Sequence, residues 1–180
     1  DQGLSEAELQ KFREALRQAE RDVRIEAFTS IKARRQEFRK NEQRGYIART
    51  IPIFEALLET AKTDPMEKNL HRYYGQFGFA LKDSCEKGDP NFIPNLKRSL
   101  ESFDEAIRLR DQAGAVGLFP TYEFSRAISQ IYLDELFQRG EPSLAEQVQK
   151  INADLKAALN AAQSNTFIYK LLTEPDEPLK

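Results

Sequence analysis

The chain has 180 residues, of which 40% are hydrophobic and 31% are charged, and its formal net charge at pH 7 is −2. These values describe one soluble globular domain that buries roughly 70% of the surface of its unfolded chain. They exclude a membrane-spanning segment, because no apolar run approaches the about 20 residues that a transmembrane helix needs. They also give no overall field that would attract a polyanionic partner.

Residues 1–44 are predicted to form one long amphipathic helix. Ser5 and Glu8 make a capping box at its start, and we expect Gly45 to cap its C-terminal end. One helix of about 38 residues is favoured over two helices that meet near Thr29-Ser30, because nothing in the pattern demands a break. Its apolar residues recur at spacings of three and four up to residue 31, namely Leu9, Phe12, Leu16, Ala19, Val23, Ala27 and Ile31, with Phe38 seven residues further on.

The segment 21–49 is strongly basic. It holds nine Lys and Arg residues against four Asp and Glu residues, so the rest of the chain is acidic. We take Arg34, Arg35 and Arg39 as a candidate anion patch, in which Arg35 and Arg39 repel each other unless an acidic group lies alongside. We expect that group to come from the same chain. The alternative is an external anionic partner, although the overall acidity and the lack of a nucleic-acid motif argue against nucleic acid.

Residues 45–173 are predicted to form helical hairpins. A helix begins near Ile51-Pro52, with proline in its first turn, and Asp64-Pro65 opens another that runs to about Ser84. Pro120 opens a later helix, and a helix that ends near Gln163 follows the break at residues 140–143. A short C-terminal capping helix and a flexible tail over residues 174–180 complete the predicted chain.

The most regular stretch is Leu70–Asp111, which predicts a pair of amphipathic helices. In its first helix Tyr74, Phe77-Gly78 and Leu81 follow the spacing of a tetratricopeptide repeat. The second helix continues the same pattern with Ser99, Phe103 and Ala106. The stretch therefore resembles a tetratricopeptide repeat, with small residues at Gly78 and Ala106 that admit side chains from the neighbouring helix.

This resemblance implies an all-α fold in which about seven helices form a right-handed array of antiparallel hairpins within a single domain, 1–180. The chain departs from the family in the long connection Cys85–Pro94 and in Asp111, which stands where the family has proline. We expect six core residues to be buried, namely Phe77, Phe103, Phe124, Ile128, Leu155 and Leu159.

A pattern of arginine, glutamine and an apolar residue occurs twice, 54 residues apart, on the far side of each helix from its buried stripe. In tetratricopeptide domains the first helix of each repeat lines a concave groove, so the resemblance implies that these side chains bind a partner. The groove residues that we expect are Arg72, Gln76, Phe79, Tyr122, Arg126 and Leu133. The alternative is that Phe79 and Leu133 only pack against neighbouring repeats.

The usual components of catalysis are missing from the sequence. His71 is the only histidine and Cys85 the only cysteine, which excludes a multi-histidine metal site and an internal disulfide. We therefore expect no enzyme, no cofactor and no metal, and we expect a cytoplasmic protein. Because the sequence starts at Asp1 rather than at Met, we also expect a processed chain or a domain of a longer protein.

The sequence thus predicts a non-catalytic scaffold module that binds a protein or peptide. Two alternatives remain open. One is binding of nucleic acid or another anionic partner through the basic segment 21–49, and the other is homo-oligomerisation in which residues 5–44 form a coiled coil.

Overall fold

The computed structural model describes residues 6–137 and 144–161, and within these ranges the chain forms six α-helices and no strand. The all-α prediction is confirmed for this part of the chain. The predicted short capping helix and the tail 174–180 lie outside the described residues. The helices are α1 Glu6–Lys40, α2 Arg44–Lys62, α3 Leu70–Asp83, α4 Phe92–Gln112, α5 Thr121–Phe137 and α6 Leu144–Ala161.

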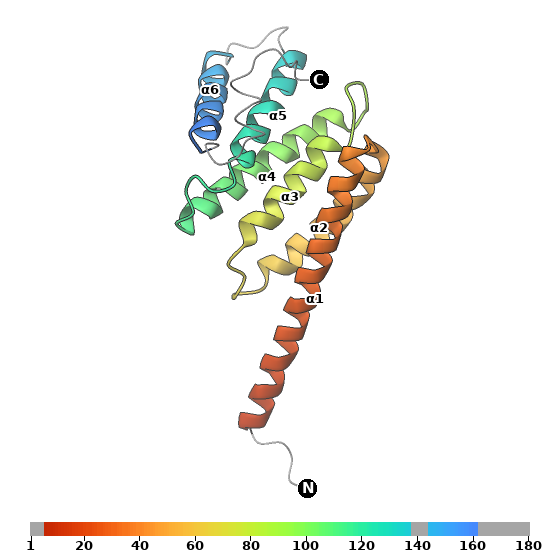
Figure 1. Ribbon diagram of the computed structural model, residues 1–180, viewed down its shortest axis with the longest axis vertical. Coiled ribbons are helices and arrows are strands. Elements are labelled where there is room, and N and C mark those ends of the chain that lie inside the picture. Colours follow the sequence, from red (N-terminus) through yellow and green to blue (C-terminus); the bar gives the residue numbers. More distant parts are fainter. Residues whose placement is uncertain (1–5, 138–143, 162–180) are drawn as a thin grey trace.

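Each helix packs against the next one along the chain, and consecutive helices run in opposite directions (Figure 1). In addition, α1 contacts α3 and α3 contacts α5. The helices α1, α3 and α5 are therefore neighbours, although another helix separates each pair in the sequence.

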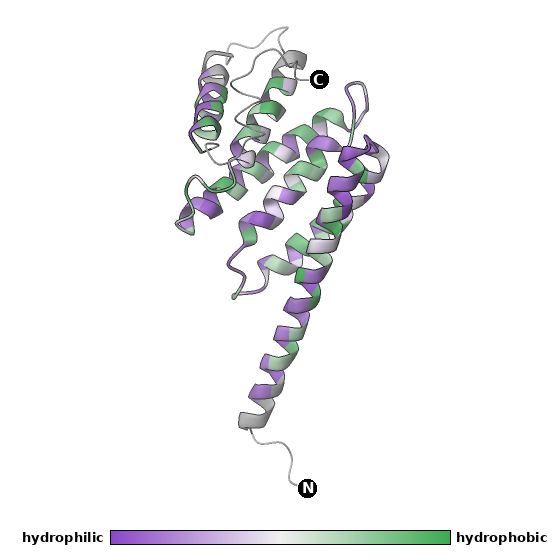
Figure 2. Ribbon diagram, in the orientation of Figure 1, coloured by the Kyte–Doolittle hydropathy of each residue, from purple (hydrophilic) through white to green (hydrophobic). Residues whose placement is uncertain are grey.

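The first helix is a single unbroken helix, as predicted. It has 35 residues whereas α2 has 19, so its N-terminal part extends beyond the rest of the molecule (Figure 1). Hydrophilic and hydrophobic residues alternate along this projecting part (Figure 2). An isolated helix of about 12–15 residues is only marginally stable in water. Most of the stability of α1 therefore comes from the part that packs on α2 and α3.

The predicted helix cap at Gly45 is wrong, because Gly45 lies inside the first turn of α2. Glu42 takes the left-handed conformation instead, with φ of 56°. The amide of Gln43 donates to the carbonyl of Phe38 at 2.8 Å and that of Glu42 to Arg39 at 3.1 Å. This pair of bonds is a Schellman motif, which satisfies the free carbonyls at the end of α1 without glycine.

The two predicted helix starts around α2 and α3 are also displaced. Pro52 lies inside α2 rather than in its first turn. Asp64 opens a turn rather than a helix, because its Oδ1 accepts a hydrogen bond from the amide of Met66 at 2.9 Å, and α3 begins only at Leu70. Proline and acidic residues suit the start of a helix and a tight turn equally well, so the sequence pattern could not separate them.

The α2–α3 connection ties α1 to the rest of the fold. Arg24 Nη2 donates to Asp64 at 2.6 Å and to Glu67 at 3.0 Å, and Arg21 Nε donates to Asp64 at 2.9 Å. Hydrogen bonds from Arg21 and Arg24 hold the pKa of Asp64 well below its usual range. Further along α1, the rings of Phe28 and Tyr73 lie 4.4 Å apart between centroids. Together these contacts fix α1 against α3.

The core of the α3–α4 hairpin rests on a close approach at Gly78. A Cβ atom there would lie 2.9 Å from the ring of Phe103, which has no exposed surface. The prediction that a small residue at Gly78 admits a side chain from the neighbouring helix is therefore confirmed. Gly75 has the same role toward α5, since a Cβ atom there would lie 2.3 Å from Tyr122.

Two of the six predicted core residues, Phe77 and Phe103, are buried. The other four are only half-buried, and these are Phe124, Ile128, Leu155 and Leu159. On α5 the buried face runs instead through Tyr122, Ser129 and Leu133. The hydroxyls of Ser99 and Ser129 lie 3.3 Å apart where α4 meets α5. Small polar residues therefore occupy this interface, whereas the apolar pattern predicted large hydrophobic residues there.

Candidate functional site

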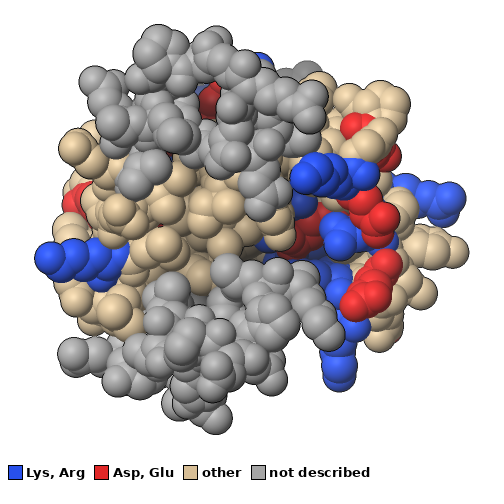
Figure 3. All heavy atoms as spheres, turned by 90° about the horizontal axis from the view of Figure 1, so that it is seen from above, with Lys and Arg blue, Asp and Glu red and all other residues tan. Residues whose placement is uncertain are grey.

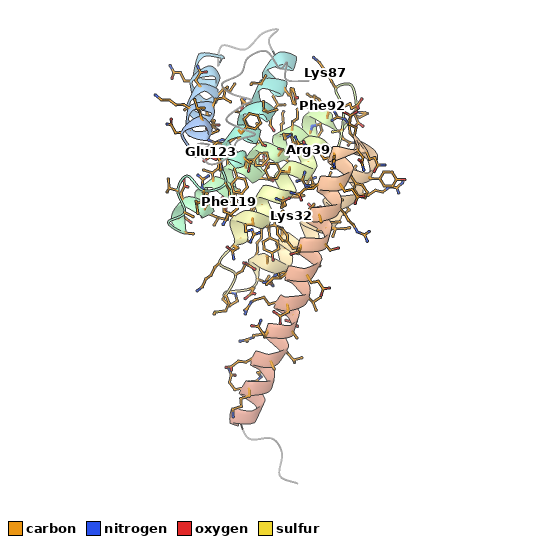
Figure 4. The ribbon with its side chains drawn as sticks, viewed as in Figure 1. Lys32, Arg39, Lys87, Phe92, Phe119 and Glu123 are labelled. Carbon is orange, nitrogen blue, oxygen red and sulfur yellow. The ribbon has the colours of Figure 1, made fainter. Side chains whose placement is uncertain are left out.

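The charged side chains that are least balanced by opposite charges lie where α1 runs alongside α3. We call them the basic cluster, which consists of Lys32, Arg35, Arg39, Arg72 and Lys82. Figure 4 shows Lys32 and Arg39 on the part of α1 that passes α3. The carboxylate that pairs with this cluster is Asp83, which is 3.2 Å from Arg35, 3.3 Å from Arg39 and 2.5 Å from Lys82.

Arg35 lies at the centre of the basic cluster, and only 4% of its surface is exposed. Its Nη1 donates to Asp83 at 3.2 Å and its Nη2 to Oε1 of Gln76 at 3.3 Å. Its guanidinium group lies 5.3 Å from the ring centroid of Phe79. Its buried Nε has no hydrogen-bond partner in the described part of the chain. One donor of this buried cation is thus unused.

The pKa values of three cluster cations are lowered. Burial, opposed by Asp83 and assisted by Arg39, lowers the pKa of Arg35 to about 10. Burial also lowers the pKa of Lys82, and burial together with Arg72 and Arg35 lowers that of Lys32. A lowered pKa of a cation means that its surroundings disfavour its positive charge. Burial therefore disfavours the positive charge of these cations, and a single carboxylate, that of Asp83, pairs with Arg35, Arg39 and Lys82.

The shortage of negative charge is greatest at Lys32 and Arg72. Both side chains are half-buried, and within residues 6–137 and 144–161 neither has a hydrogen bond or an ion pair. Seen from above, the side of the molecule that carries α1 and α2 shows Lys and Arg side chains mixed with Asp and Glu (Figure 3). The two unpaired cations stand side by side on neighbouring helices, which is an arrangement suited to an oxyanion.

An aromatic group lies on the α5 side of the cluster. Tyr122 stacks on Phe119 at 5.6 Å between ring centroids, and its hydroxyl lies 3.3 Å from Nδ1 of His71. Burial raises the pKa of Tyr122, and Arg72 partly opposes this increase. Arg72 is therefore close to this aromatic group as well as to Lys32.

The structure brings together residues that the sequence assigned to two separate sites. Arg72, Gln76 and Phe79 of the predicted groove lie beside Arg35 and Arg39 of the predicted anion patch. The third patch residue, Arg34, is exposed and lies on a different side of α1. The face between α1 and α3 thus contains half of the predicted groove and two thirds of the predicted patch.

The three groove residues predicted on α5 do not lie on this face. Tyr122 and Leu133 are 2% and 5% exposed, so they belong to the interior. Arg126 pairs with Asp104 of α4 at 2.6 Å and with Asp154 of α6. The residues of the two helices match at an offset of 54 in the sequence, but α5 is rotated about its axis relative to α3. The polar residues of α5 therefore face the neighbouring helices. The expected groove across α3 and α5 is therefore not formed by these residues.

The sequence reasoning missed Lys32, Lys82 and Asp83. Lys32, Arg35 and Arg39 are three and four residues apart, which puts them on one face of α1, whereas Arg34 is rotated by about 100° from Arg35. Choosing cations by helical face rather than by density along the chain would have found Lys32. The pairing of Asp83 with Arg35 and Arg39 of α1 depends on tertiary packing, for which the sequence carries no local signal.

The basic segment meets acidic residues of the same chain, as the favoured interpretation predicted. Arg24 pairs with Asp64 and Glu67, and Arg44 Nε lies 2.9 Å from Glu86. These ion pairs account for several cations of segment 21–49. They do not reach Lys32.

Comparison with known proteins found no matching family, no similar curated protein and no similar solved structure. No helix in the described residues is long and apolar enough to cross a membrane. Within the same residues, no group of three or more His, Cys, Asp and Glu side chains is placed to hold a metal ion.

Proposed function

We propose that this chain is a non-catalytic scaffold module that binds a protein or peptide on the face between α1 and α3. The observation that carries the proposal is the unpaired positive charge at Lys32 and Arg72, next to half-buried Gln76 and Phe79. Cations, an amide and an aromatic ring on adjacent helices give the mixture of charge, hydrogen bonding and apolar contact from which protein interfaces are built.

We further propose that the helices form a right-handed array similar to that of tetratricopeptide repeats. Three features support this arrangement. Consecutive helices are antiparallel, α3 touches both α1 and α5, and Phe103 packs on Gly78 where the repeat pattern places a large residue against a small one. In such an array α1, α3 and α5 share one side, and a partner on that side contacts the basic cluster.

If the proposed function is correct, a partner protein should no longer bind when the α1–α3 face is altered. The double variant Arg72→Ala with Gln76→Ala removes two half-buried side chains and with them one acceptor of Arg35. Because Asp83 still pairs with Arg35, the variant should keep its circular dichroism spectrum. In pull-downs from the native host it should lose a protein that the unaltered chain retains, with affinity reduced about 30-fold or more, equivalent to about 2 kcal/mol.

The matched control is Arg34→Ala, which also removes an arginine but on an exposed part of α1 outside the cluster. It should retain the same partner. Retention of every captured protein by the folded double variant would show that the α1–α3 face is not the binding surface.

Self-association through α1 is a second candidate function, and a specific observation favours it. Leu16 and Val23 lie on the same side of α1 and are 49% and 67% exposed. They line a groove of about 820 Å³ between α1 and the C-terminal end of α2, whose other lining residues include Ala27, Leu57 and Thr60. An apolar stripe on a helix is the feature through which two helices form a coiled coil.

If this second function holds, the full chain should sediment as a dimer and the double variant Leu16→Glu with Val23→Glu as a monomer, because buried glutamates would repel and lose their hydration. Ala33→Glu, on an exposed part of α1, should leave the sedimentation coefficient unchanged. A full chain that is monomeric at all concentrations tested would exclude this function.

A further inference from the structure

The basic cluster points to the chemistry of the partner. We propose that Lys32 and Arg72 bind a carboxylate of an acidic, extended peptide segment, with buried Arg35 behind them as a fixed positive charge. This inference rests on the proposed function and specifies the ligand of the same site.

The positive charges of the basic cluster outnumber the carboxylates that pair with them. Arg35, Arg39 and Lys82 share one buried carboxylate, that of Asp83. Lys32 and Arg72 lie close enough to repel each other, yet no acidic group in the described part of the chain pairs with either. An incoming carboxylate would relieve this repulsion. A hydrogen bond to a charged group contributes about 1.5–3 kcal/mol, roughly twice what a neutral pair contributes.

The buried cation of the site is held in place by its neighbours. Arg35 is fixed by Asp83, by Gln76 and by its contact with Phe79. Its Nε is buried and has no hydrogen-bond partner among the residues that the structure describes, so this donor of the fixed cation remains unused. A preorganised cation loses less conformational freedom on binding than a mobile surface lysine does.

The basic cluster suits a peptide better than it suits a nucleic acid. A nucleic acid needs a long row of cations that match its phosphates. Here Asp83 lies inside the cluster and would repel a polyphosphate chain. Gln76, whose Oε1 already accepts a hydrogen bond from Arg35, offers its amide N–H donors to a peptide backbone, and half-buried Phe79 offers apolar surface. The cluster therefore fits one or two carboxylates on a polypeptide better than a continuous polyanion.

The test uses the full chain and a fluorescein-labelled peptide of alternating Glu and Ser, whose binding is followed by fluorescence anisotropy. The comparison peptide has Gln in place of Glu. We expect the Glu peptide to bind and the Gln peptide to bind at least about tenfold more weakly. Added sodium chloride should weaken the binding of the Glu peptide, because exposed charges are screened by salt.

The variants Lys32→Glu and Arg72→Glu reverse the charge at the two unpaired cations, and each should weaken binding of the Glu peptide by about tenfold or more. Lys32→Ala gives a milder change in case charge reversal disturbs folding. Arg34→Glu changes the same net charge on the exposed part of α1, and it should leave the affinity within about twofold of that of the unaltered chain.

Three results would overturn the inference. They are equal binding of the Glu and Gln peptides, equal losses in the Arg34 and Lys32 variants, and tighter binding of a single-stranded oligonucleotide than of the Glu peptide. The test is independent of the pull-down for the proposed function. The two tests can fail separately. If the double variant Arg72→Ala with Gln76→Ala loses a host protein but the unaltered chain does not bind the Glu peptide, the proposed function stands and the acidic ligand is wrong.

Discussion

Replacing Phe103 with alanine should lower the free energy of unfolding by about 3–5 kcal/mol. Phe103 has no exposed surface, and its ring fills the space above Gly78 and lies 5.1 Å from the ring of Phe79. Because Gly78 has no side chain that could fill the space, alanine should leave a cavity. Urea denaturation followed by circular dichroism measures the loss.

Leu118→Ala is the matched control for this large-to-small change. Leu118 is 58% exposed, so its truncation should alter the free energy of unfolding by about 0.5 kcal/mol or less. A loss of less than about 1 kcal/mol for Phe103→Ala would mean that Phe103 does not hold α3 and α4 together.

Replacing Asp83 with asparagine should destabilise the fold by about 3–5 kcal/mol, because it removes the carboxylate that balances the buried cation Arg35. Asp83 is 9% exposed and pairs with Arg35, Arg39 and Lys82. Burial by itself would raise the pKa of Asp83, but Lys82 and Arg39 lower it overall. Since the folded pKa lies below the ordinary 3.8, the stabilisation is present above that pH and is lost as the pH falls below it.

Two companion variants test the cause of this loss. Glu86→Gln breaks an ion pair of similar composition whose side chains are 74% and 47% exposed, and it should cost about 1 kcal/mol or less. Adding Arg35→Met to Asp83→Asn should recover part of the stability, because the buried cation without a counter-ion is then removed. Equal effects of Asp83→Asn and Glu86→Gln would show that the cluster is effectively solvated.

The parts of the fold that could be predicted from the sequence depend on local and regular signals. The unbroken α1 follows from a long amphipathic pattern without Gly or Pro, and the packing of Phe103 on Gly78 follows from residues at fixed helical spacing. The helix ends at Gly45 and Asp64 were misplaced because the same residues also suit neighbouring turns. Local chemistry identified the elements but did not fix their limits.

The face that α5 buries could not be predicted, because it depends on how α5 is rotated against α3 and α4. An apolar stripe of Phe124 and Ile128 was available, yet the helix packs through Tyr122 and Ser129. Gly75 explains part of this choice, since its missing side chain makes room for the ring of Tyr122. That complementarity joins residues 47 positions apart, and a periodic pattern within one helix does not contain it.

About half of the candidate site could be predicted. Arg35, Arg39, Arg72, Gln76 and Phe79 were identified, but as members of two sites, since nothing in the sequence shows that α1 lies beside α3. The imbalance of charge that makes the site a candidate became visible only when Asp83 was seen to be shared by several cations.

The most direct test of the binding face is a heteronuclear NMR titration of the full chain with the peptide of alternating Glu and Ser. We predict that the backbone shift changes concentrate in α1 around Lys32 to Arg39 and in α3 around Arg72 to Phe79, and that α4 and the part of α1 before Arg21 change little. Shift changes that are absent, or that centre on the projecting part of α1, would contradict the assignment of the α1–α3 face as the binding surface.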